Sequence, residues 1–219
     1  MKSFPLDPRP AALLERYHRR TRKRTPWLQV VLFTALAPIV ALLTRIRFHG
    51  REHIPDGGFI LAPNHPSQLD AFFAAITLGR RVRFMAKSDL FTRRWGRWLA
   101  RVGAFPVRRG VWDEEAFETA QTLLERGKIL AMFFEGGVSP VGGYRDPKPG
   151  VGYVALRAGA TVLPCHLSGT RGLYRPWTWP KITITYGPPL VFERNDEPTR
   201  EANAEAAATI ADAVKALAP

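Results

Sequence analysis

The stretch from Phe59 to Asp70 reads FILAPNHPSQLD and contains the clearest strand-to-helix transition of the chain. Residues 59–62 form a short continuous apolar run between two glycines and a proline, which predicts a buried strand. Residues 67–78 follow with a polar first turn and an apolar body, and Gly79 suits the end of a helix. This stretch therefore predicts a buried strand that turns directly into a helix.

The same alternation continues on the carboxyl-terminal side. Further apolar runs predict strands at residues 82–85, 128–134, 161–167 and 181–186. Helices are expected at residues 113–127, 151–158 and 199–217. Because strands that alternate with helices indicate an α/β fold, we expect a single domain over residues 46–219. It should hold a mixed, mostly buried sheet flanked by helices.

Composition limits the class of protein. The chain has 219 residues, of which 46% are hydrophobic and 11% aromatic, enough for a substantial core. Global disorder is therefore excluded. Cys165 is the single cysteine, which excludes a disulfide framework and a cysteine-rich zinc site and suits a reducing compartment.

Positive charge is concentrated near the amino terminus. The net charge is +13, of which residues 1–51 supply +9. Arginines and one lysine crowd between Arg16 and Arg24, and residues 25–44 then carry no charge at all. Because most of the excess lies outside the predicted α/β domain, it describes a partner of this segment rather than the fold.

The uncharged run from Trp27 to Leu43 is apolar enough to enter a bilayer but short for crossing it. A helix of that length reaches about 25 Å, against roughly 30 Å of hydrocarbon, and Pro38 would kink it. Basic residues flank the run on both sides, which favours a monotopic anchor at the cytoplasmic face of a membrane. We therefore divide the chain into residues 1–45, a basic arm and membrane-associated helix, and residues 46–219.

Three other interpretations of this arm are a core helix, a signal peptide and a nucleic-acid-binding arm. A buried core helix beside a solvated basic segment has the same composition. A cleaved signal peptide is disfavoured because the basic region starts late and no convincing cleavage site follows. A nucleic-acid-binding arm is disfavoured because aromatic residues are not interleaved with the charges.

A histidine and an aspartate follow the first predicted strand. His65 stands at the strand-to-helix turn and Asp70 about one helical turn later, so the carboxylate can reach back to the imidazole. Such a pair fixes the imidazole tautomer and stabilises the imidazolium that forms when the histidine takes a proton. No serine is in register, which suggests that the nucleophile is a hydroxyl of the substrate. Alone, this spacing also fits a loop histidine and a solvated aspartate.

Further motifs follow in order and strengthen the first interpretation. They read MAKSDL at residues 85–90, GAFPVRR at 103–109, FFEGGVS at 133–139 and VLP at 162–164. With the His65/Asp70 pair, this series resembles the glycerolipid acyltransferase family, the 1-acylglycerol-3-phosphate acyltransferases and their relatives. The resemblance covers about residues 46–192, most of the chain.

The resemblance implies transfer of a fatty acyl group from acyl-CoA or acyl-acyl carrier protein to the free hydroxyl of a lysolipid. The family's commonest acceptor is 1-acylglycerol-3-phosphate, which gives phosphatidate in phospholipid biosynthesis. His65 would be the general base on that hydroxyl and Asp70 would orient it. No metal or resident cofactor is implied beyond the thioester co-substrate. The expected partners are membrane lipids and the acyl donor, not nucleic acid.

The resemblance also implies acceptor-binding residues. Arg109 would hold the acceptor phosphate, because a guanidinium fork matches phosphate geometry. Lys87 is a secondary candidate for the same anion. Glu135 and Gly136 lie in the loop whose backbone N–H groups would approach the oxyanion or the acceptor. Glu135 would order this loop or hold an acceptor hydroxyl.

One departure from the family pattern bears on the acceptor. The family commonly has an arginine where this chain has Val138, and a proline where it has Phe134. A valine cannot bind an anion. The charge is then supplied from elsewhere, or the acceptor is another lysophospholipid or a lyso-aminolipid. Candidates for the missing charge are Arg108, Arg145, Lys148 and Arg171.

Other patterns carry less weight. Residues 150–155 fit a G-x-G-x-x-A dinucleotide fingerprint, but prolines precede them where a strand is required. Ser139 narrowly misses a nucleophile elbow because the final glycine is absent. A non-catalytic membrane-surface protein that keeps the fold remains the alternative from another functional class, although a binding module has no need of a positioned base.

Overall fold

Eight strands pair into one mixed sheet in the computed structural model, which describes residues 8–219. Across the sheet their order is β1-β7-β6-β2-β5-β3-β4, and β8 pairs with β6. The strands are β1 Arg45–His49, β2 Ile60–Pro63, β3 Val82–Lys87, β4 Ala104–Val107, β5 Ile129–Ala131, β6 Thr161–Ser168, β7 Lys181–Tyr186 and β8 Leu190–Val191.

Strand directions set where the functional loops gather. Strands β2 to β6 are mutually parallel, β7 is antiparallel to β6, and β1 is parallel to β7. The predicted mixed sheet is therefore confirmed. The chain leaves β2 for β3 on one side, whereas β5 leads to β6 on the other side of β2. In open α/β sheets such a reversal leaves a crevice at the carboxyl ends of the strands.

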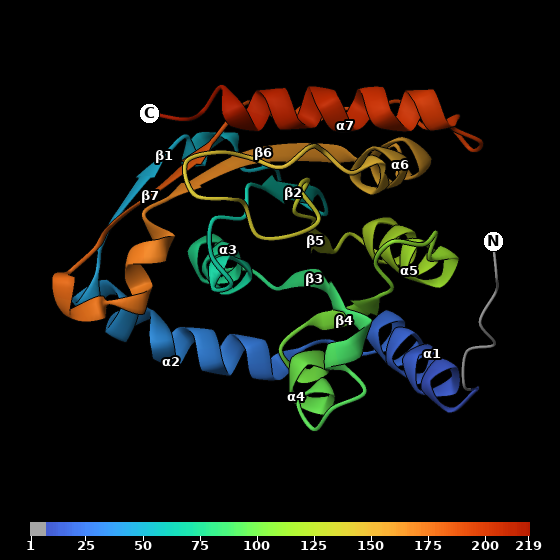
Figure 1. Cartoon of the computed structure of the whole chain (residues 1–219), viewed down its shortest axis with the longest axis horizontal. Coiled ribbons are helices and arrows are strands. Elements are labelled where there is room, and N and C mark those ends of the chain that lie inside the picture. The colour runs from blue at the N-terminus through green and yellow to red at the C-terminus, as the bar shows by residue number, and fades with distance from the viewer. Residues whose placement is uncertain (1–7) are drawn as a thin grey trace.

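Helices cover both faces of the sheet (Figure 1). The α2 and α3 helices lie on one face, and α5, α6 and α7 lie on the other. The α-helices are α1 Pro8–Lys23, α2 Trp27–Leu43, α3 Asp70–Leu78, α4 Gly96–Arg101, α5 Glu114–Glu125, α6 Pro149–Ala158 and α7 Arg200–Lys215. Short 3-10 turns are η1 Arg51–His53, η2 Ser88–Leu90, η3 Thr170–Tyr174 and η4 Pro176–Thr178.

The first predicted strand lies in the middle of the core. Phe59 and Leu61 belong to the cluster on the α2–α3 face, and Ile60 and Ala62 to the cluster on the α5–α7 face. All four side chains are fully buried. A strand covered on both sides needs apolar residues at every position, which explains the unbroken run in the sequence.

Among the boundaries that differ from the prediction, two lie beside the candidate site. The α3 helix begins at Asp70, later than expected, because the Asp70 carboxylate accepts a hydrogen bond from the backbone N–H of Ser67 and closes a turn there. Strand β5 ends at Ala131, and residues 132–134 leave the sheet for the loop that follows. Both differences fall where the chain turns into the candidate site.

The amino-terminal helices pack onto the α/β core. Gln29 of α2 is buried, and its amide nitrogen donates to the carbonyl oxygens of Val82 at 2.7 Å and Val102 at 3.0 Å. Phe33 packs edge-on against Phe72 of α3, with ring centroids 4.7 Å apart. Residues 1–7 of the predicted arm lie outside the described residues.

Helix length and composition bear on the predicted anchor. Within residues 8–219, no one helix has both the length and the apolar character needed to cross a membrane. Among the described helices, one pair, Ala11–Lys23 and Trp27–Leu43, meets that criterion jointly, and it is bent by 75°.

A buried histidine in α1 should make stability depend on pH. His18 is 2% exposed and its Nδ1 lies 3.0 Å from the hydroxyl of Thr119, and burial lowers its pKa from 6.5 to about 4. The imidazole is thus neutral in the folded state at a pH where the unfolded chain already binds a proton. We expect His18 to destabilise the fold progressively as the pH falls from about 6.5 to 4, by up to about 3 kcal/mol.

The measurement is urea unfolding across this pH range for the wild type and for His18→Gln. The glutamine can still hydrogen-bond Thr119 but does not titrate. The free energy of unfolding should therefore fall more steeply with acid in the wild type. Parallel curves for the two proteins would contradict the role assigned to His18.

Candidate active site

The residues singled out in the sequence follow the carboxyl ends of neighbouring parallel strands. His65 comes after β2, Glu135 after β5 and Arg109 after β4, while Lys87 is the last residue of β3. Because these strands are parallel, their carboxyl ends meet at one edge of the sheet. The topology thus brings together motifs that are up to 70 residues apart, such as His65 and Glu135.

His65 and Asp70 form the predicted pair. The Nδ1 atom of His65 lies 3.0 Å from Oδ2 of Asp70, whose side chain is fully buried. The same oxygen accepts the Ser67 backbone N–H at 2.5 Å. A carboxylate that receives Nδ1–H leaves the Nε2 atom as the unprotonated, basic nitrogen of the ring.

Neighbouring groups hold the histidine in place. The imidazole stacks on the ring of Phe133, with centroids 4.0 Å apart and planes at 24°. The preceding residue, Asn64, is tied to strand β6 because its side-chain amide exchanges two hydrogen bonds with the backbone of Leu167. The side chain of His65 keeps 12% of its surface exposed. The ring is therefore fixed in orientation but still reachable.

Glu135 organises the loop after β5. Its carboxylate is buried and accepts three hydrogen bonds: from the backbone N–H of His65 at 3.0 Å, from the Ser139 hydroxyl at 2.6 Å and from the backbone N–H of Arg145 at 2.7 Å. Ser139 also returns to His65, because its N–H donates to the His65 carbonyl oxygen. These contacts join the loop to His65. They engage both carboxylate oxygens of Glu135 within the protein.

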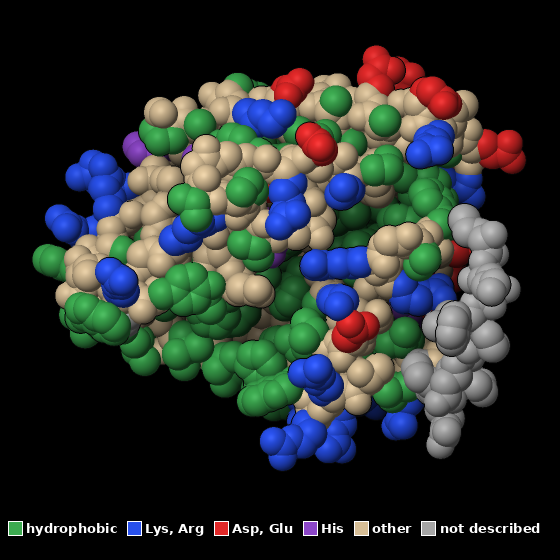
Figure 2. Space-filling model, in the orientation of Figure 1, with side chains coloured by type: hydrophobic (Ala, Val, Ile, Leu, Met, Phe, Trp, Pro, Cys, Tyr) green, Lys and Arg blue, Asp and Glu red, His purple; other side chains and the backbone are tan. Residues whose placement is uncertain are grey.

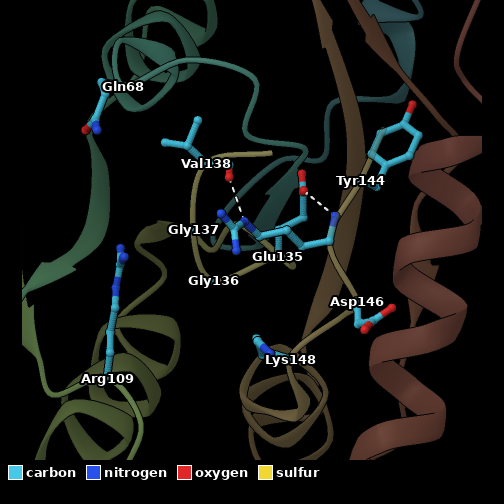
Figure 3. A pocket seen from close by; sticks show the side chains of 10 residues that line it. Gln68, Arg109, Glu135, Gly136, Gly137, Val138, Tyr144, Asp146 and Lys148 are labelled. Atoms are coloured by element: carbon cyan, nitrogen blue, oxygen red, sulfur yellow. Dashed lines mark hydrogen bonds between the residues drawn. The ribbon is translucent and has the colours of Figure 1, made fainter. Parts of the chain in front are cut away.

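A cavity of about 560 Å³ opens beside this loop (Figure 3). Figure 3 shows Arg109 on one side and Lys148 on the other, with the Gly136–Gly137 turn between them. The residues that line it are Gln68, Arg109, Glu135, Gly136, Gly137, Val138, Tyr144, Arg145, Asp146 and Lys148. His65 is not one of them, but it is three residues from Gln68 and hydrogen-bonded to Glu135. The cavity therefore borders the loop that is hydrogen-bonded to the backbone of His65.

The Gly-Gly turn allows a close approach of the surrounding side chains. Gly136 has φ +64°, and a Cβ atom there would lie 2.9 Å from Cγ of Lys148. A Cβ at Gly137 would lie 3.9 Å from both a guanidinium nitrogen of Arg109 and Nε of Arg145. Both arginines therefore approach Gly137. The Gly136 N–H donates to the Phe133 carbonyl oxygen, whereas the N–H of Gly137 has no such partner among the described residues.

The structure distinguishes among the four candidate cations for the charge that Val138 lacks. Arg108 is bound to Asp113 through its guanidinium at 2.8 Å, and this hydrogen bond raises its pKa. Arg171 is occupied by the carbonyl oxygens of Pro66, Ser139 and Pro140. Of these four cations, the two that line the cavity are Arg145 and Lys148.

Lys87 lies elsewhere at the same edge. Its Nζ is 2.5 Å from Oδ2 of Asp89, and this hydrogen bond lowers the pKa of Asp89. It does not line the cavity that contains Arg109. Arg109 and Lys87, predicted to hold the same anion, are thus not brought together around this space.

Sequence reasoning did not single out Gln68, Tyr144 or Asp146, which also line the cavity. The Tyr144 hydroxyl lies 3.0 Å from Nε2 of His166, and burial raises the pKa of Tyr144 and lowers that of His166. Within the described residues, no group of three or more histidine, cysteine, aspartate or glutamate side chains is arranged to hold a metal ion.

Comparison with known proteins agrees with this architecture. The family model described as Acyltransferase matches residues 45–168, more than half of the chain, and the chain belongs to this acyltransferase family.

Among curated relatives, the 1-acyl-sn-glycerol-3-phosphate acyltransferase of Bacillus subtilis is 31% identical over 47% of this chain and 53% of its own. That of Streptococcus pneumoniae is 26% identical over 76% of this chain and 67% of its own. The match to the Bacillus subtilis protein thus spans about half the length of that relative. The crystal structure of the 1-acyl-sn-glycerophosphate acyltransferase PlsC from Thermotoga maritima shares the fold. It superposes with a TM-score of 0.60 at 21% identity, over 98% of this chain and 84% of that one.

Proposed function

We propose that this protein transfers a fatty acyl group from an acyl thioester to the free hydroxyl of a lysolipid, with 1-acylglycerol-3-phosphate as the first candidate acceptor. The observation that carries the proposal is the His65/Asp70 pair beside a cavity bordered by Arg109, Arg145 and Lys148. A positioned base next to a cationic cavity suits an acceptor that carries both a hydroxyl and an anionic group. The named curated relatives act on this class of acceptor.

His65 would act directly on the acceptor. Its Nε2 takes the hydroxyl proton as the hydroxyl oxygen attacks the thioester carbonyl carbon, and Asp70 stabilises the imidazolium through Nδ1–H. When the tetrahedral intermediate collapses, the carbon–sulfur bond breaks. The proton held on Nε2 passes to the departing thiolate, which leaves as a thiol. The new ester bond joins the acyl group to the acceptor, and the imidazole returns to its neutral form.

The loop after β5 supplies donors for the charge that develops. The tetrahedral intermediate carries an oxyanion, which preorganised backbone N–H groups stabilise. The Gly137 N–H lacks a protein acceptor among residues 8–219, and the Glu135 carboxylate holds this loop against His65. We assign Gly137 to the oxyanion or to the neighbouring acceptor oxygen. Glu135 keeps the loop in register with the base.

Arg109 and Arg145 would bind the acceptor's anionic group. Both approach Gly137, and Lys148 borders the same cavity. Arg145 donates through Nε to the Val138 carbonyl oxygen at 2.6 Å, so its guanidinium is anchored at the position where the family commonly has arginine. The cation that Val138 lacks would therefore be supplied by a residue later in the loop.

This assignment predicts how binding responds to substitution. Arg109→Ala and Arg145→Ala should each raise the KM for 1-acylglycerol-3-phosphate by about 10- to 100-fold, the value of one charge-assisted hydrogen bond. The kcat should change much less. Arg194→Ala is the control, because Arg194 is exposed, paired with Asp196 and outside the cavity. An unchanged KM in both cavity variants would contradict the assignment.

Membrane association would bring the protein to its lipid substrate. The α2 helix exposes Trp27, Val31, Ile39 and Leu42, and Figure 2 shows hydrophobic side chains gathered on this side of the molecule. Basic side chains flank this surface in the sequence before and after α2. We propose that α2 lies in the cytoplasmic leaflet as a monotopic anchor, with arginines at the headgroups.

Two alternatives are separated by one assay. Purified protein is incubated with labelled acyl-CoA or acyl-acyl carrier protein and a panel of lysolipids, among them lysophosphatidate, lysophospholipids and a lyso-aminolipid. Preference for lysophosphatidate supports the first candidate acceptor, and preference for another lysolipid reassigns it. A protein that binds the vesicles but consumes no thioester with any acceptor would be the non-catalytic surface protein instead.

A further inference from the structure

A second, smaller cavity lies where α1 gives way to α2. Its volume is about 60 Å³, and its lining residues are Arg20, Thr21, Arg24, Thr25, Pro26, Trp27, Arg83, Ala100 and Arg101. Four of these are arginines and none is acidic. They come from the α1–α2 segment, from β3 and from α4, so the tertiary fold brings their charges together.

Arg83 shows that the charge here is not balanced by the described protein. Its side chain is 6% exposed, and its guanidinium donates to the backbone carbonyl oxygen of Arg24. Burial lowers its pKa from 12.5 to about 10. No carboxylate of residues 8–219 forms an ion pair with it. A buried cation without a counter-charge is costly, and an anion in the cavity would offset that cost.

The size and surroundings of the cavity indicate which anion. At about 10–15 Å³ for each water-sized group, it has room for a phosphate group but not for a nucleotide. Trp27 lines the cavity, is 67% exposed and begins α2, the helix with the exposed apolar side chains. Tryptophan favours the level of the headgroups at a bilayer surface. The cavity thus lies at the edge of the surface that would contact lipid.

The cavity is separate from the candidate active site. Arg83 is the second residue of β3, whereas the active-site loops follow the opposite, carboxyl-terminal ends of the parallel strands. The two cavities have no lining residue in common. A ligand here would not take part in acyl transfer.

We propose that this arginine cavity binds the phosphate of an anionic phospholipid at the membrane surface and so fixes how the protein sits on the bilayer. The proposal rests on the membrane association of α2 proposed above. The guanidinium groups of Arg24 and Arg101 would pair with the phosphate oxygens from the exposed side, and Arg83 from the buried side. General surface charge would attract the protein to any anionic bilayer, whereas this cavity adds contacts with a single headgroup.

The test is flotation of the purified full chain with phosphatidylcholine vesicles, with and without phosphatidylglycerol. Arg24→Gln and Arg101→Gln should each reduce binding to the anionic vesicles by tenfold or more, the range of about 1.5–3 kcal/mol for a charge-assisted hydrogen bond. Arg97→Gln is the matched control, because Arg97 is exposed on α4 one turn before Arg101 but does not line the cavity. The loss of one basic side chain that acts only through general surface charge should reduce vesicle binding about fivefold.

The possible outcomes distinguish failure of the phosphate cavity from failure of the α2 anchor or of the proposed enzyme activity. Equal, roughly fivefold losses in all three variants would overturn the cavity as a site and leave only general charge. Competition by millimolar inorganic phosphate without any preference for anionic vesicles would assign the cavity to a soluble anion and overturn the lipid. Absence of wild-type binding to every vesicle would contradict the α2 anchor itself. Transfer to a short-chain, water-soluble acceptor should be unchanged in Arg24→Gln, and it reports on the enzyme activity separately.

Discussion

Replacing His65 with alanine should lower kcat for acyl transfer by about 10²–10⁴-fold and leave the protein folded. The loss follows because Nε2 of His65 is the group placed to take the acceptor proton, with Nδ1 held by Asp70 at 3.0 Å. The ring contributes little to the core, since it stacks on Phe133 at the edge of the sheet. The KM for the lysolipid should change less than kcat, because the anion-binding residues stay in place.

The measurement is steady-state acyl transfer with thermal unfolding of the same preparations. His49→Ala is a suitable control, because His49 is on the exposed edge strand β1 and outside the site. His65→Ala should unfold at nearly the wild-type temperature. Wild-type turnover in a folded His65→Ala protein would refute the proposed mechanism.

Changing Asp70 to asparagine should cost about 10²–10⁴-fold in kcat, although Asp70 need not touch the substrate. Oδ2 of Asp70 receives hydrogen bonds from both Nδ1 of His65 and the backbone N–H of Ser67. An asparagine has a single acceptor oxygen and a donor NH₂ group. If the amide oxygen takes the place of Oδ2, it accepts both hydrogen bonds but offers no negative charge to the imidazolium. If the NH₂ group takes that place, it faces Nδ1 of His65, favours the tautomer with Nε2 protonated and removes the base.

The split between kcat and KM distinguishes this positioning role from a purely structural one. Asp70 acts on the base, whereas the cations that border the cavity are Arg109, Arg145 and Lys148. The kcat of a folded Asp70→Asn protein should therefore fall, while the KM for the lysolipid changes little. A folded variant that keeps the wild-type kcat, or one that loses lysolipid binding in step with kcat, would contradict the positioning role.

The central part of the fold could be predicted because burial determines its sequence. Strand β2 is covered on both faces and therefore reads as an unbroken apolar run. The edge strands β1 and β4 have no comparable apolar run, free of charge and of proline, in the sequence. β1 alternates charged and apolar residues because one side faces solvent, and β4 contains Pro106, which an edge strand tolerates because one side of it makes no ladder hydrogen bonds.

The candidate site could be predicted only in part from the sequence, and the reason is different. The His65/Asp70 pair lies within one turn of chain, so spacing alone could bring its side chains together. The role of Glu135 depends on partners as far away as His65, and the pairing of Lys87 with Asp89 could not be read from a motif. The four candidate cations could be reduced to Arg145 and Lys148 only from the loop geometry, because these two line the cavity.

The most direct test of the account is the release of free thiol from acyl-CoA or acyl-acyl carrier protein by the purified protein, measured with and without lysolipid. We predict that thiol release depends on the lysolipid and is accompanied by formation of the diacyl product. We also predict that thiol release is lost in His65→Ala. Thiol release that ignores the lysolipid, or that continues unchanged without the imidazole, would contradict the account.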